Sequence, residues 1–240
     1  MHYFFADGFD GSSFIISDRD SVNHAKVLRL GIKEEVMVSH NGQVFLCTVC
    51  EQGKSILLQK IRKLDIRPDR IRITLYQSLP KKKKFENILE KATETGVVNF
   101  IPVNSEHVQQ VYKEKKEERF RKILKNAAMQ SRRLDIPQLF DLTEIGDINA
   151  ESELRLILHP YKGSEHLSDI IRRNPDISSV DIAIGPEGGF SDRDINTLKK
   201  KGFIPAAVPC GIMRTENAAM CTASILKYEY EDLSDNQFRL

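Results

Sequence analysis

The pattern of apolar and polar positions divides the chain into two regions. Near the N-terminus, three apolar or alternating runs are separated by short turns, the first of which is Asn41-Gly42. An Asn-Gly pair between two such runs is a strong signal for a two-residue hairpin. Ahead of these runs, residues 23–32 have the pattern of a short helix, which Gly31 is placed to end. Short strands joined by tight turns predict a small β-barrel in this region.

From Arg70 onward, predicted strands and helices alternate. Strands are predicted at residues 72–80, 97–103, 153–160, 180–186 and 203–209, and helices at 83–96, 113–133, 191–202 and 215–233. In the first of these helices, Phe85, Ile88 and Leu89 recur at helical spacing. Ser191 is placed as the N-cap of the third helix. The alternation predicts βαβ units and a mainly parallel sheet that is covered on both faces.

A predicted linker at residues 65–70 separates the two regions. We therefore expect a small β-domain at residues 1–68 and an α/β domain at residues 69–240. The 240 residues are 40% hydrophobic and 29% charged, which is typical of a soluble protein. No apolar run approaches the roughly 20 residues of a membrane span, and the N-terminus has no basic segment followed by a long apolar stretch. We therefore expect a cytoplasmic protein with no membrane partner.

Cys47 and Cys50 have the spacing of half a zinc site. They lie in a predicted strand, however, where residues three apart point to opposite faces of the sheet. No second pair of Cys or His residues in the sequence completes a tetrahedral set of ligands. We therefore expect no metal site, and we expect four buried or partly buried free thiols at Cys47, Cys50, Cys210 and Cys221.

The formal net charge is only +2, so the chain is not a basic scaffold that coats nucleic acid indiscriminately. Its positive charge is clustered in short runs at residues 81–84, 113–116, 132–133 and 199–201. Runs of this kind are usually solvated faces. A local basic patch can also bind phosphates while the net charge stays near zero, so both interpretations remain open.

Ligands of open α/β sheets bind at the carboxyl ends of the strands. One predicted strand ends in the sequence GPEGG, residues 185–189. This loop lacks the Lys and Ser/Thr of a P-loop and the G-x-G-x-x-G spacing of a dinucleotide site, and Pro186 has no backbone donor. Its glycines allow a flat ligand to approach the backbone closely. A plain turn before a helix is an equal alternative.

A second predicted strand ends in the sequence VPCGIMRTE, residues 208–216. Because a long helix follows, this segment is a structured loop rather than a short hairpin. It carries Arg214 and Glu216, and Thr215 stands at the expected N-cap of the helix. Small residues at the start of that helix let it pack closely against a neighbour. Packing within the domain explains them, and a dimer interface would use them too.

Six segments in a fixed order carry a specific resemblance to a known family. They are NHAKVLRLGI (23–32), LPKKKKFENILEKATETGV (79–97), NAAMQSRRLDIPQL (126–139), LILHP (156–160), IGPEGGFS (184–191) and GIMRTENAA (211–219). With these motifs, which span nearly the whole chain, the sequence resembles the RsmE family. These proteins are 16S ribosomal RNA (uracil-N3)-methyltransferases of the SPOUT superfamily.

The resemblance implies an α/β fold in two parts. A small N-terminal PUA-like β-barrel that binds RNA would precede a SPOUT-type α/β domain. In that domain, roughly residues 153–230 would form a deep trefoil knot, a rare exception to the rule that chains are unknotted. The resemblance also implies a homodimer through the knot domain, the small ribosomal subunit as partner and S-adenosyl-L-methionine as cofactor. The implied cofactor contacts are Leu158, His159, Ile184, Gly185, Pro186, Glu187, Gly188, Gly189, Val208, Pro209, Gly211, Ile212, Met213 and Thr215.

By the same resemblance, Arg214 and Glu216 are the candidate catalytic residues. Arg214 would stabilise the negative charge that develops on uracil as N3 loses its proton. A structural ion pair with Glu216 or a clamp on a phosphate is the alternative role. Glu187 would orient cofactor or substrate, or would instead favour the helix that follows it. The candidate RNA contacts are His24, Lys26, Arg29, Lys84, Arg132 and Arg133.

The sequence departs from the family's pattern where Met129, Pro209, Gly211 and Asn217 replace the usual residue types, and where His107 replaces an arginine. The implied activity is methylation of uracil N3 at one uridine in the decoding region of 16S rRNA. Two alternatives remain. One is an RNA-binding member of the fold with weak or no catalysis, and the other is a SPOUT methyltransferase that acts on another RNA nucleotide.

Overall fold

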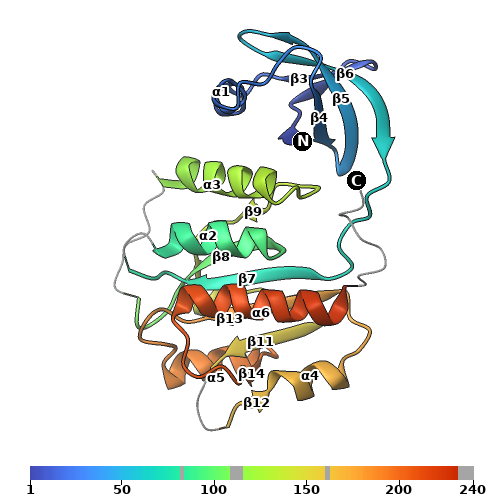
Figure 1. Ribbon diagram of the computed structural model, residues 1–240. Coiled ribbons are helices and arrows are strands. Elements are labelled where there is room, and N and C mark those ends of the chain that lie inside the picture. The colour runs from blue at the N-terminus through green and yellow to red at the C-terminus, as the bar shows by residue number, and fades with distance from the viewer. Residues whose placement is uncertain (82–83, 109–115, 160–162, 232–240) are drawn as a thin grey trace. The chain divides into compact units, whose positions relative to one another are not determined.

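Figure 1 shows the computed structural model, which describes residues 1–81, 84–108, 116–159 and 163–231. Parts of the predicted elements, at residues 83, 113–115, 160 and 232–233, lie outside these described residues. The chain forms two compact units. Among the described residues, unit 1 contains those of 1–68 and 128–136, and unit 2 contains those of 69–127 and 137–231. None of the described helices has the length and apolar character that crossing a membrane requires.

Unit 1 is built on a six-stranded curled sheet (blue to cyan in Figure 1). Its elements are β1 (His2–Phe5), β2 (Gly8–Phe9), β3 (Ser13–Ile16), α1 (Arg19–Val27), β4 (Glu35–His40), β5 (Gln43–Gln52) and β6 (Ile56–Leu64). The strand order is β1-β4-β5-β6-β3-β2. β1 pairs with β4 in parallel, and the other neighbours are antiparallel.

The hairpin predicted at Asn41-Gly42 is confirmed. β4 and β5 pair up to His40 and Gln43, and the two residues between them both have positive φ, 49° for Asn41 and 69° for Gly42. Two consecutive positive φ values are those of the type I′ turn, whose twist matches that of the flanking strands.

The prediction that Gly31 ends the first helix is wrong. Helix α1 begins at Arg19, where the side chain of Asp18 caps it, and it ends at Val27. The reversal is made by Arg29, which has a φ of 54°. The Arg29 amide donates to Lys26 O and the Leu30 amide to Ala25 O, which is the Schellman pattern of a helix C-terminus. An arginine thus occupies the position where glycine is usual.

The core of unit 1 is formed by the inner face of the curled sheet together with residues from the 128–136 segment. Phe4, Phe14 and Val38 are fully buried there, and Ala128 and Met129 belong to the same cluster. Met129 is only 6% exposed. A charged side chain at this position would have to be buried, so methionine at residue 129 is explained by packing.

Unit 2 is built on a sheet of eight strands, all of whose pairings are parallel. Its strands are β7 (Arg72–Ser78), β8 (Val97–Asn104), β9 (Gln138–Leu139), β10 (Thr143–Glu144), β11 (Leu154–Leu158), β12 (Glu165–His166), β13 (Ser179–Ile184) and β14 (Ile204–Ala207). The order is β10-β8-β7-β13-β11-β14-β12, and β9 pairs with β8. The predicted parallel sheet is confirmed.

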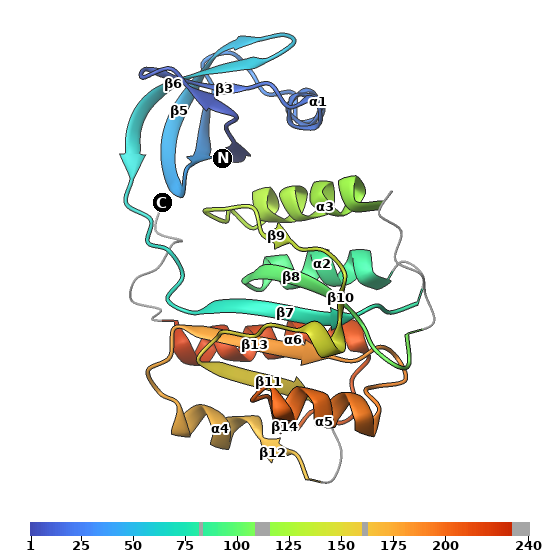
Figure 2. The same ribbon diagram turned by 180° about the vertical axis from the view of Figure 1, so that it is seen from behind.

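Helices cover both faces of this sheet, as predicted. They are α2 (Lys84–Glu94), α3 (Glu117–Gln130), η2 (Ile145–Asp147), α4 (Leu167–Arg173), α5 (Asp192–Lys200) and α6 (Thr215–Tyr230). Leu75 and Leu156 pack in one core with residues of α2, α3, α4 and α6, whereas Tyr76 and Ile157 pack in a second core with α5. Helices α2 and α6 lie in front of the sheet in Figure 1 and behind it in Figure 2.

The sequence pattern missed several short elements of unit 2. Helix α4 and strands β9, β10 and β12 were not predicted, because each strand has only two residues and α4 only seven. Helix α3 ends at Gln130 rather than at Arg133. The capping of α5 is confirmed, since Ser191 and Asp194 form a complete capping box.

The four cysteines are free, but they are not all buried as expected. Cys47 is buried and Cys50 is exposed, so the two thiols on β5 diverge as predicted. Cys221 is partly buried on α6, whereas Cys210 is exposed. The expectation is therefore wrong for Cys50 and Cys210. Among the described residues, no group of three or more His, Cys, Asp or Glu side chains is arranged to hold a metal ion.

Candidate functional site

A cavity of about 430 Å³ lies at the carboxyl end of the parallel sheet of unit 2. Three segments that follow β11, β13 and β14 form its wall, and Lys84 at the start of α2 completes it. The volume is in the range of ordinary small-molecule sites. The lining residues are Lys84, Leu158, His159, Ile184, Gly185, Pro186, Glu187, Gly188, Gly189, Phe190, Ala206, Ala207, Val208, Gly211, Ile212, Met213, Arg214, Thr215 and Ala218.

The loop after β13 folds back tightly on itself, which requires glycine. A Cβ atom on Gly185 would lie 2.8 Å from both Gly189 C and Phe190 N, a clash with backbone that no side-chain rotation relieves. Gly189 has a φ of 70°, and its amide donates to Pro186 O over 2.9 Å. The ring of His107 closes over this loop, with Nδ1 3.1 Å from Gly189 O.

A buried hydrogen-bond network ties the loop after β13 to the start of α6. The hydroxyl of Thr215 donates to Gly185 O over 2.8 Å and accepts from the side-chain amide of Gln77 over 3.0 Å. Gln77 lies in β7 and is fully buried. Thr215 is therefore not the N-cap expected from the sequence. Thr215 is the first helical residue of α6, and Arg214 holds the N-cap position without a capping hydrogen bond from its side chain.

Lys84 lies between two carboxylates at the edge of the cavity. Its Nζ atom is 3.0 Å from Glu187 Oε1 and 3.8 Å from Glu216 Oε2. The Lys81 amide also donates to both carboxylate oxygens of Glu187, over 3.0 and 3.2 Å. Partial burial disfavours the charged form of Glu187, but the hydrogen bonds from Lys84 and the backbone outweigh it and hold the pKa of this carboxyl below its usual value.

These contacts show what holds the side chain of Glu187 in place. Its carboxylate connects the glycine loop to the start of α2, whereas Ser191 and Asp194 cap the helix that follows the loop. They also change the interpretation of Lys84. This ammonium group is paired with carboxylates at the cavity wall, and its contact with RNA stays a prediction.

The two candidate catalytic residues occupy different positions. Arg214 lines the cavity and is exposed, and among the described residues its guanidinium makes no hydrogen bond or ion pair. The ion pair between Arg214 and Glu216, considered above as an alternative role, is therefore not formed among the described residues. Glu216 does not line the cavity, and its side chain is only 14% exposed. Its Oε2 atom is buried without a hydrogen bond and faces Lys84 at ion-pair distance.

Most candidate cofactor contacts line this one cavity, and Pro209 is the exception because it is exposed outside the lining. Gly211 has a φ of 74°, which explains why glycine suits this position. Sequence reasoning missed Phe190, Ala206, Ala207 and Ala218, as well as the placement of Lys84. Ala206 and Ala207 at the end of β14 and Ala218 at the start of α6 gave one signal, because small residues leave space beside a cleft.

His159 lies at the end of β11, and its amide donates to Ala206 O over 3.0 Å. Burial has the largest effect on this histidine and lowers its pKa. Asp192 raises that pKa by less, and Lys199 lowers it further. The imidazole is therefore kept neutral at neutral pH. The wall of the cavity at this point is uncharged.

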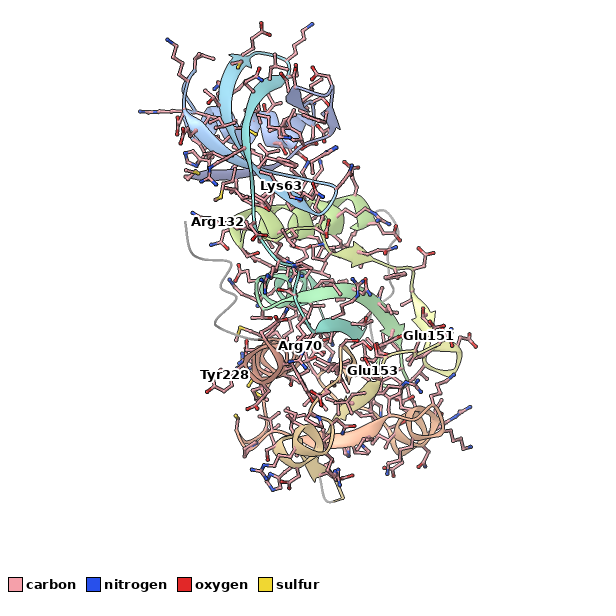
Figure 3. All side chains as sticks on the ribbon, turned by 90° about the vertical axis from the view of Figure 1, so that its right-hand side faces the viewer. Lys63, Arg70, Arg132, Glu151, Glu153 and Tyr228 are labelled. Carbon is pink, nitrogen blue, oxygen red and sulfur yellow. The ribbon has the colours of Figure 1, made fainter. Side chains whose placement is uncertain are left out.

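The remaining RNA candidates all belong to unit 1. His24, Lys26 and Arg29 are exposed on α1 and at its C-terminus. Arg132 and Arg133 follow α3, and Figure 3 labels Arg132. Arg132 ends α3 with the same Schellman pattern that Arg29 forms at the end of α1. Its φ is 53°, its amide donates to Met129 O, and the Arg133 amide donates to Ala128 O. Both helices thus end on an arginine in the left-handed conformation.

The cavity is suited to a flat, largely uncharged ligand. Backbone groups, alanines and aliphatic side chains make most of its wall, and its charged side chains are the Lys84–Glu187 pair and Arg214. Residues 67–227, more than half of the chain, match the family described as RNA methyltransferase domain. The parallel α/β sheet, the cleft at its carboxyl edge and this match define an RNA methyltransferase.

Within that class, the chain belongs to the ribosomal RNA small subunit methyltransferase E family. It is 32% identical over 230 residues to the protein of that name from Aquifex aeolicus, which covers 94% of this chain and 99% of the relative. The protein of the same name from Bacillus subtilis is 30% identical over 180 residues, 70% of each chain.

Solved structures have the same fold. A methyltransferase from Legionella pneumophila, in complex with bound S-adenosylmethionine, superposes with a TM-score of 0.84 at 26% identity and covers 97% of this chain and 98% of its own. The ribosomal RNA small subunit methyltransferase E from Neisseria gonorrhoeae, bound to S-adenosylmethionine, has a TM-score of 0.84 at 21% identity, with 95% and 97% covered.

Proposed function

We propose that this protein transfers the methyl group of S-adenosylmethionine to N3 of one uridine in the decoding region of 16S ribosomal RNA. The observation that carries the proposal is the cavity of about 430 Å³ at the carboxyl edge of the sheet, lined by most of the residues that family membership points to. Its glycine loop offers backbone groups and close approach rather than a phosphate cradle, which suits an adenosine moiety.

The residues present fit this cofactor in shape and in chemistry. Gly185 is needed for the fold of the loop, and small or aliphatic residues such as Ala206, Ala218 and Ile184 leave a smooth wall. His159 is held neutral, so the wall carries no positive charge there against a sulfonium centre. When bound, S-adenosylmethionine supplies a methyl group on a positively charged sulfur.

Arg214 is the residue best placed to assist the transfer. Uracil N3 becomes a nucleophile as it loses its proton, and the resulting negative charge spreads to O2 and O4. A guanidinium at the rim of the cavity, with no ion pair among the described residues, is available to stabilise that charge. Glu216 acts as a positioning residue, because its carboxylate holds Lys84 rather than reaching the cavity.

Unit 1 would hold the RNA while unit 2 performs the transfer. Basic side chains of α1 and of the segment after α3 would supply phosphate contacts: His24, Lys26 and Arg29, which are exposed, and Arg132 and Arg133, which are half-buried. A target uridine inside folded rRNA must be splayed out of its stack to be reached. Phosphate contacts of this kind predict binding that weakens steeply as salt increases.

We also infer the finer features of the fold that the family implies. The curled sheet of residues 1–68 would be a PUA-like barrel, and residues 153–230 would pass through themselves in a deep trefoil knot. The order of the strands supports the knot: β11 lies between β13 and β14, and Thr215 bonds back to Gly185 across the loop of β13.

A homodimer through the knot domain is the third part of the proposal. Ala218, Ala219 and Ala223 face the domain's own core, so they do not supply the interface. The opposite side of α6 presents Met220 and Tyr228, which are 36% and 76% exposed, with exposed Ser224 between them. Residues four apart lie on one face of a helix, so the three form a stripe that a second copy could cover.

Two measurements test the activity. Titration calorimetry should detect binding of S-adenosylmethionine, and incubation with small ribosomal subunits should produce 3-methyluridine at one mapped position. Absence of cofactor binding would favour an RNA-binding protein without catalysis, whereas a methyl group on another atom or base would refute the uridine-N3 assignment. Arg214→Ala should abolish transfer while changing cofactor affinity by less than about tenfold, or ~1.4 kcal/mol.

A further inference from the structure

Unit 1 contains an aromatic cluster that opens to solvent at one end of its sheet. The rings of Phe9 and Phe14 are stacked, with centroids 4.4 Å apart and planes at 27°. Phe45 packs on Phe14 at 4.9 Å, and His40 lies 5.6 Å from Phe14. Phe14 and Phe45 are buried, whereas Phe9 is 39% exposed. Phe9 is thus the outermost member of a stack whose inner members belong to the core.

The exposed ring is held in place by a rigid turn. Phe9 lies in the short strand β2, which pairs with β3 through Phe9 and Phe14. A carboxylate oxygen of Asp10 then accepts hydrogen bonds from the amides of Ser12 and Ser13, over 2.9 and 2.7 Å. An aromatic ring presented in this way has already lost its conformational freedom, so contacts with a ligand cost less entropy.

A cation accompanies this ring. The Nζ atom of Lys60 lies 4.9 Å from the centroid of Phe45 and 5.7 Å from that of Phe9. Lys60 lies in an exposed stretch of β6 that begins at Gln59, and Ile61, Arg62 and Lys63 follow it there. Figure 3 labels Lys63. In the described part of the chain, no carboxylate pairs with the side chains of Lys60, Arg62 or Lys63.

The same stretch of β6 has an irregular, half-open backbone. β3 pairs with β6 only as far as Gln59, and the Lys60 amide makes a last bond to Ser12 O at 3.3 Å. On the other side, Arg62 pairs with Leu46 and Lys60 with Cys47, so Ile61 is an extra residue in a β-bulge. Ile61 is 47% exposed. Bulges of this kind aim side chains away from the regular sheet and often accompany binding sites.

From these observations we propose that Phe9 and the exposed stretch Lys60–Lys63 form a binding site for single-stranded RNA, separate from the cations of α1 and of the segment after α3. One unstacked base lies on the ring of Phe9, and Lys60, Arg62 and Lys63 contact the adjoining phosphates. The site rests on the proposed function only in that the substrate is RNA. Aromatic platforms beside unpaired cations bind single strands through stacking and charge, with little preference for sequence.

The chain offers a direct test because it contains no tryptophan. A Phe9→Trp variant of the full chain carries a single tryptophan, which is excited apart from the six tyrosines and whose emission is quenched when a base stacks on it. Phe140→Trp is the matched control, since Phe140 has nearly the same exposure, 37%, in unit 2. The probe is an oligouridylate of about eight nucleotides, within the usual site size of such platforms. We expect quenching at residue 9 and none at residue 140.

Three outcomes overturn the proposal: no quenching at residue 9, equal quenching at both residues, or a response to anionic phospholipid vesicles with none to RNA. Affinity supplies the second test. Phe9→Leu keeps an apolar side chain against Phe14 but removes the flat face, so oligouridylate binding should weaken by about tenfold. Lys60→Gln and Lys63→Gln should each lower the salt dependence of log K by roughly one phosphate contact. An unchanged affinity of Phe9→Leu would count against the site.

These readouts separate the site from the methyltransferase activity. Binding of the oligouridylate is measured without methyl donor, and circular dichroism of each variant shows whether unit 1 is folded. If transfer to ribosomal subunits fails while Phe9→Trp is quenched, the proposed function is wrong and the RNA site stands. If transfer occurs and no quenching is seen, the RNA site is wrong and the function stands.

Discussion

The ammonium group of Lys84 lies 3.0 Å from a carboxylate oxygen of Glu187, and this pair joins the start of α2 to the glycine loop that walls the cavity. Both side chains are partly exposed, at 35% and 27%. Ion pairs in such surroundings contribute little to stability, about 0–1 kcal/mol. The pair is therefore better understood as fixing the position of the loop than as holding the domain together.

Lys84→Met should separate these two roles. Removing the cation leaves Glu187 and Glu216 as neighbouring negative charges, so the loop shifts and transfer should fall by at least about tenfold, or ~1.4 kcal/mol of transition-state stabilisation. The urea midpoint should change little. Lys84→Arg keeps the charge and serves as the control. A variant with full activity would remove this pair from the function of the cleft.

The same substitution has a predicted effect on pH dependence. In the native protein the pKa of Glu187 is lowered, so its contribution to stability is present above the ordinary carboxyl pKa and is lost as the pH falls through the lowered value. Without Lys84 that pKa should rise. Acid unfolding curves followed by circular dichroism should then show Lys84→Met losing stability at a higher pH than the native chain.

Thr215→Val should loosen the joint between α6 and the loop after β13. Valine has nearly the same shape, but it removes the hydroxyl that donates to Gly185 O and accepts from the Gln77 amide, at a cost of about 1 kcal/mol. The Gln77 amide keeps its hydrogen bond to Ser78 O over 2.9 Å. Cofactor affinity should fall together with stability, as measured by calorimetry and urea unfolding. Thr215→Ser retains the hydroxyl and should restore both. Equal behaviour of the Val and Ser variants would show that the network is unimportant.

Gly185→Ala and Gly188→Ala form a second matched pair within the cavity wall. A Cβ on Gly185 would lie 2.8 Å from backbone atoms, so the loop must move and cofactor binding should be lost. A Cβ on Gly188 would meet His107 Cβ at 3.5 Å, an ordinary contact that the fold accommodates. Thermal unfolding should therefore separate the two variants. If Gly185→Ala binds cofactor normally, the loop is more compliant than its geometry indicates.

The sequence predicted the parallel sheet and its long helices because their residues follow regular periods. It could not predict α4 or the two-residue strands, whose formation depends on tertiary pairing. Most of the cavity wall was predicted, because glycines and strand ends mark it. The placement of Lys84 was not, since a run of four lysines gives no sign that one of them is paired between two carboxylates. The ends of α1 and α3 were missed because arginine rarely adopts a positive φ.

His159 should make stability depend on pH near neutrality. Burial lowers the pKa of its imidazole below the ordinary value of 6.5, so the unfolded chain binds a proton before the folded chain does. Stability therefore declines as the pH falls from about 6.5 through the lowered pKa. His159→Gln removes the titrating imidazole. The urea midpoint of this variant should therefore fall less than that of the native chain between about pH 7.5 and about pH 5.5. A parallel decline of both proteins would contradict the assignment.

The stripe of Met220, Ser224 and Tyr228 on α6 is the proposed interface of the homodimer, and a substitution in it tests whether the dimer forms there. Tyr228 is 76% exposed and points away from the helix (Figure 3), so Tyr228→Arg should not destabilise a monomer. If a second copy covers this stripe, the substitution buries an unpaired charge at the interface, and the dimer should dissociate. Light scattering coupled to gel filtration measures this directly.

Ile32→Arg provides the control for that experiment, because Ile32 is another exposed apolar side chain, 55% exposed, in unit 1 rather than on α6. It should leave the mass unchanged. Dissociation of Tyr228→Arg should also reduce methyl transfer if the active site needs the neighbouring subunit, whereas retained activity in a monomer would show a self-sufficient cleft. A native protein that is monomeric at every concentration tested would exclude the stripe as a dimer interface.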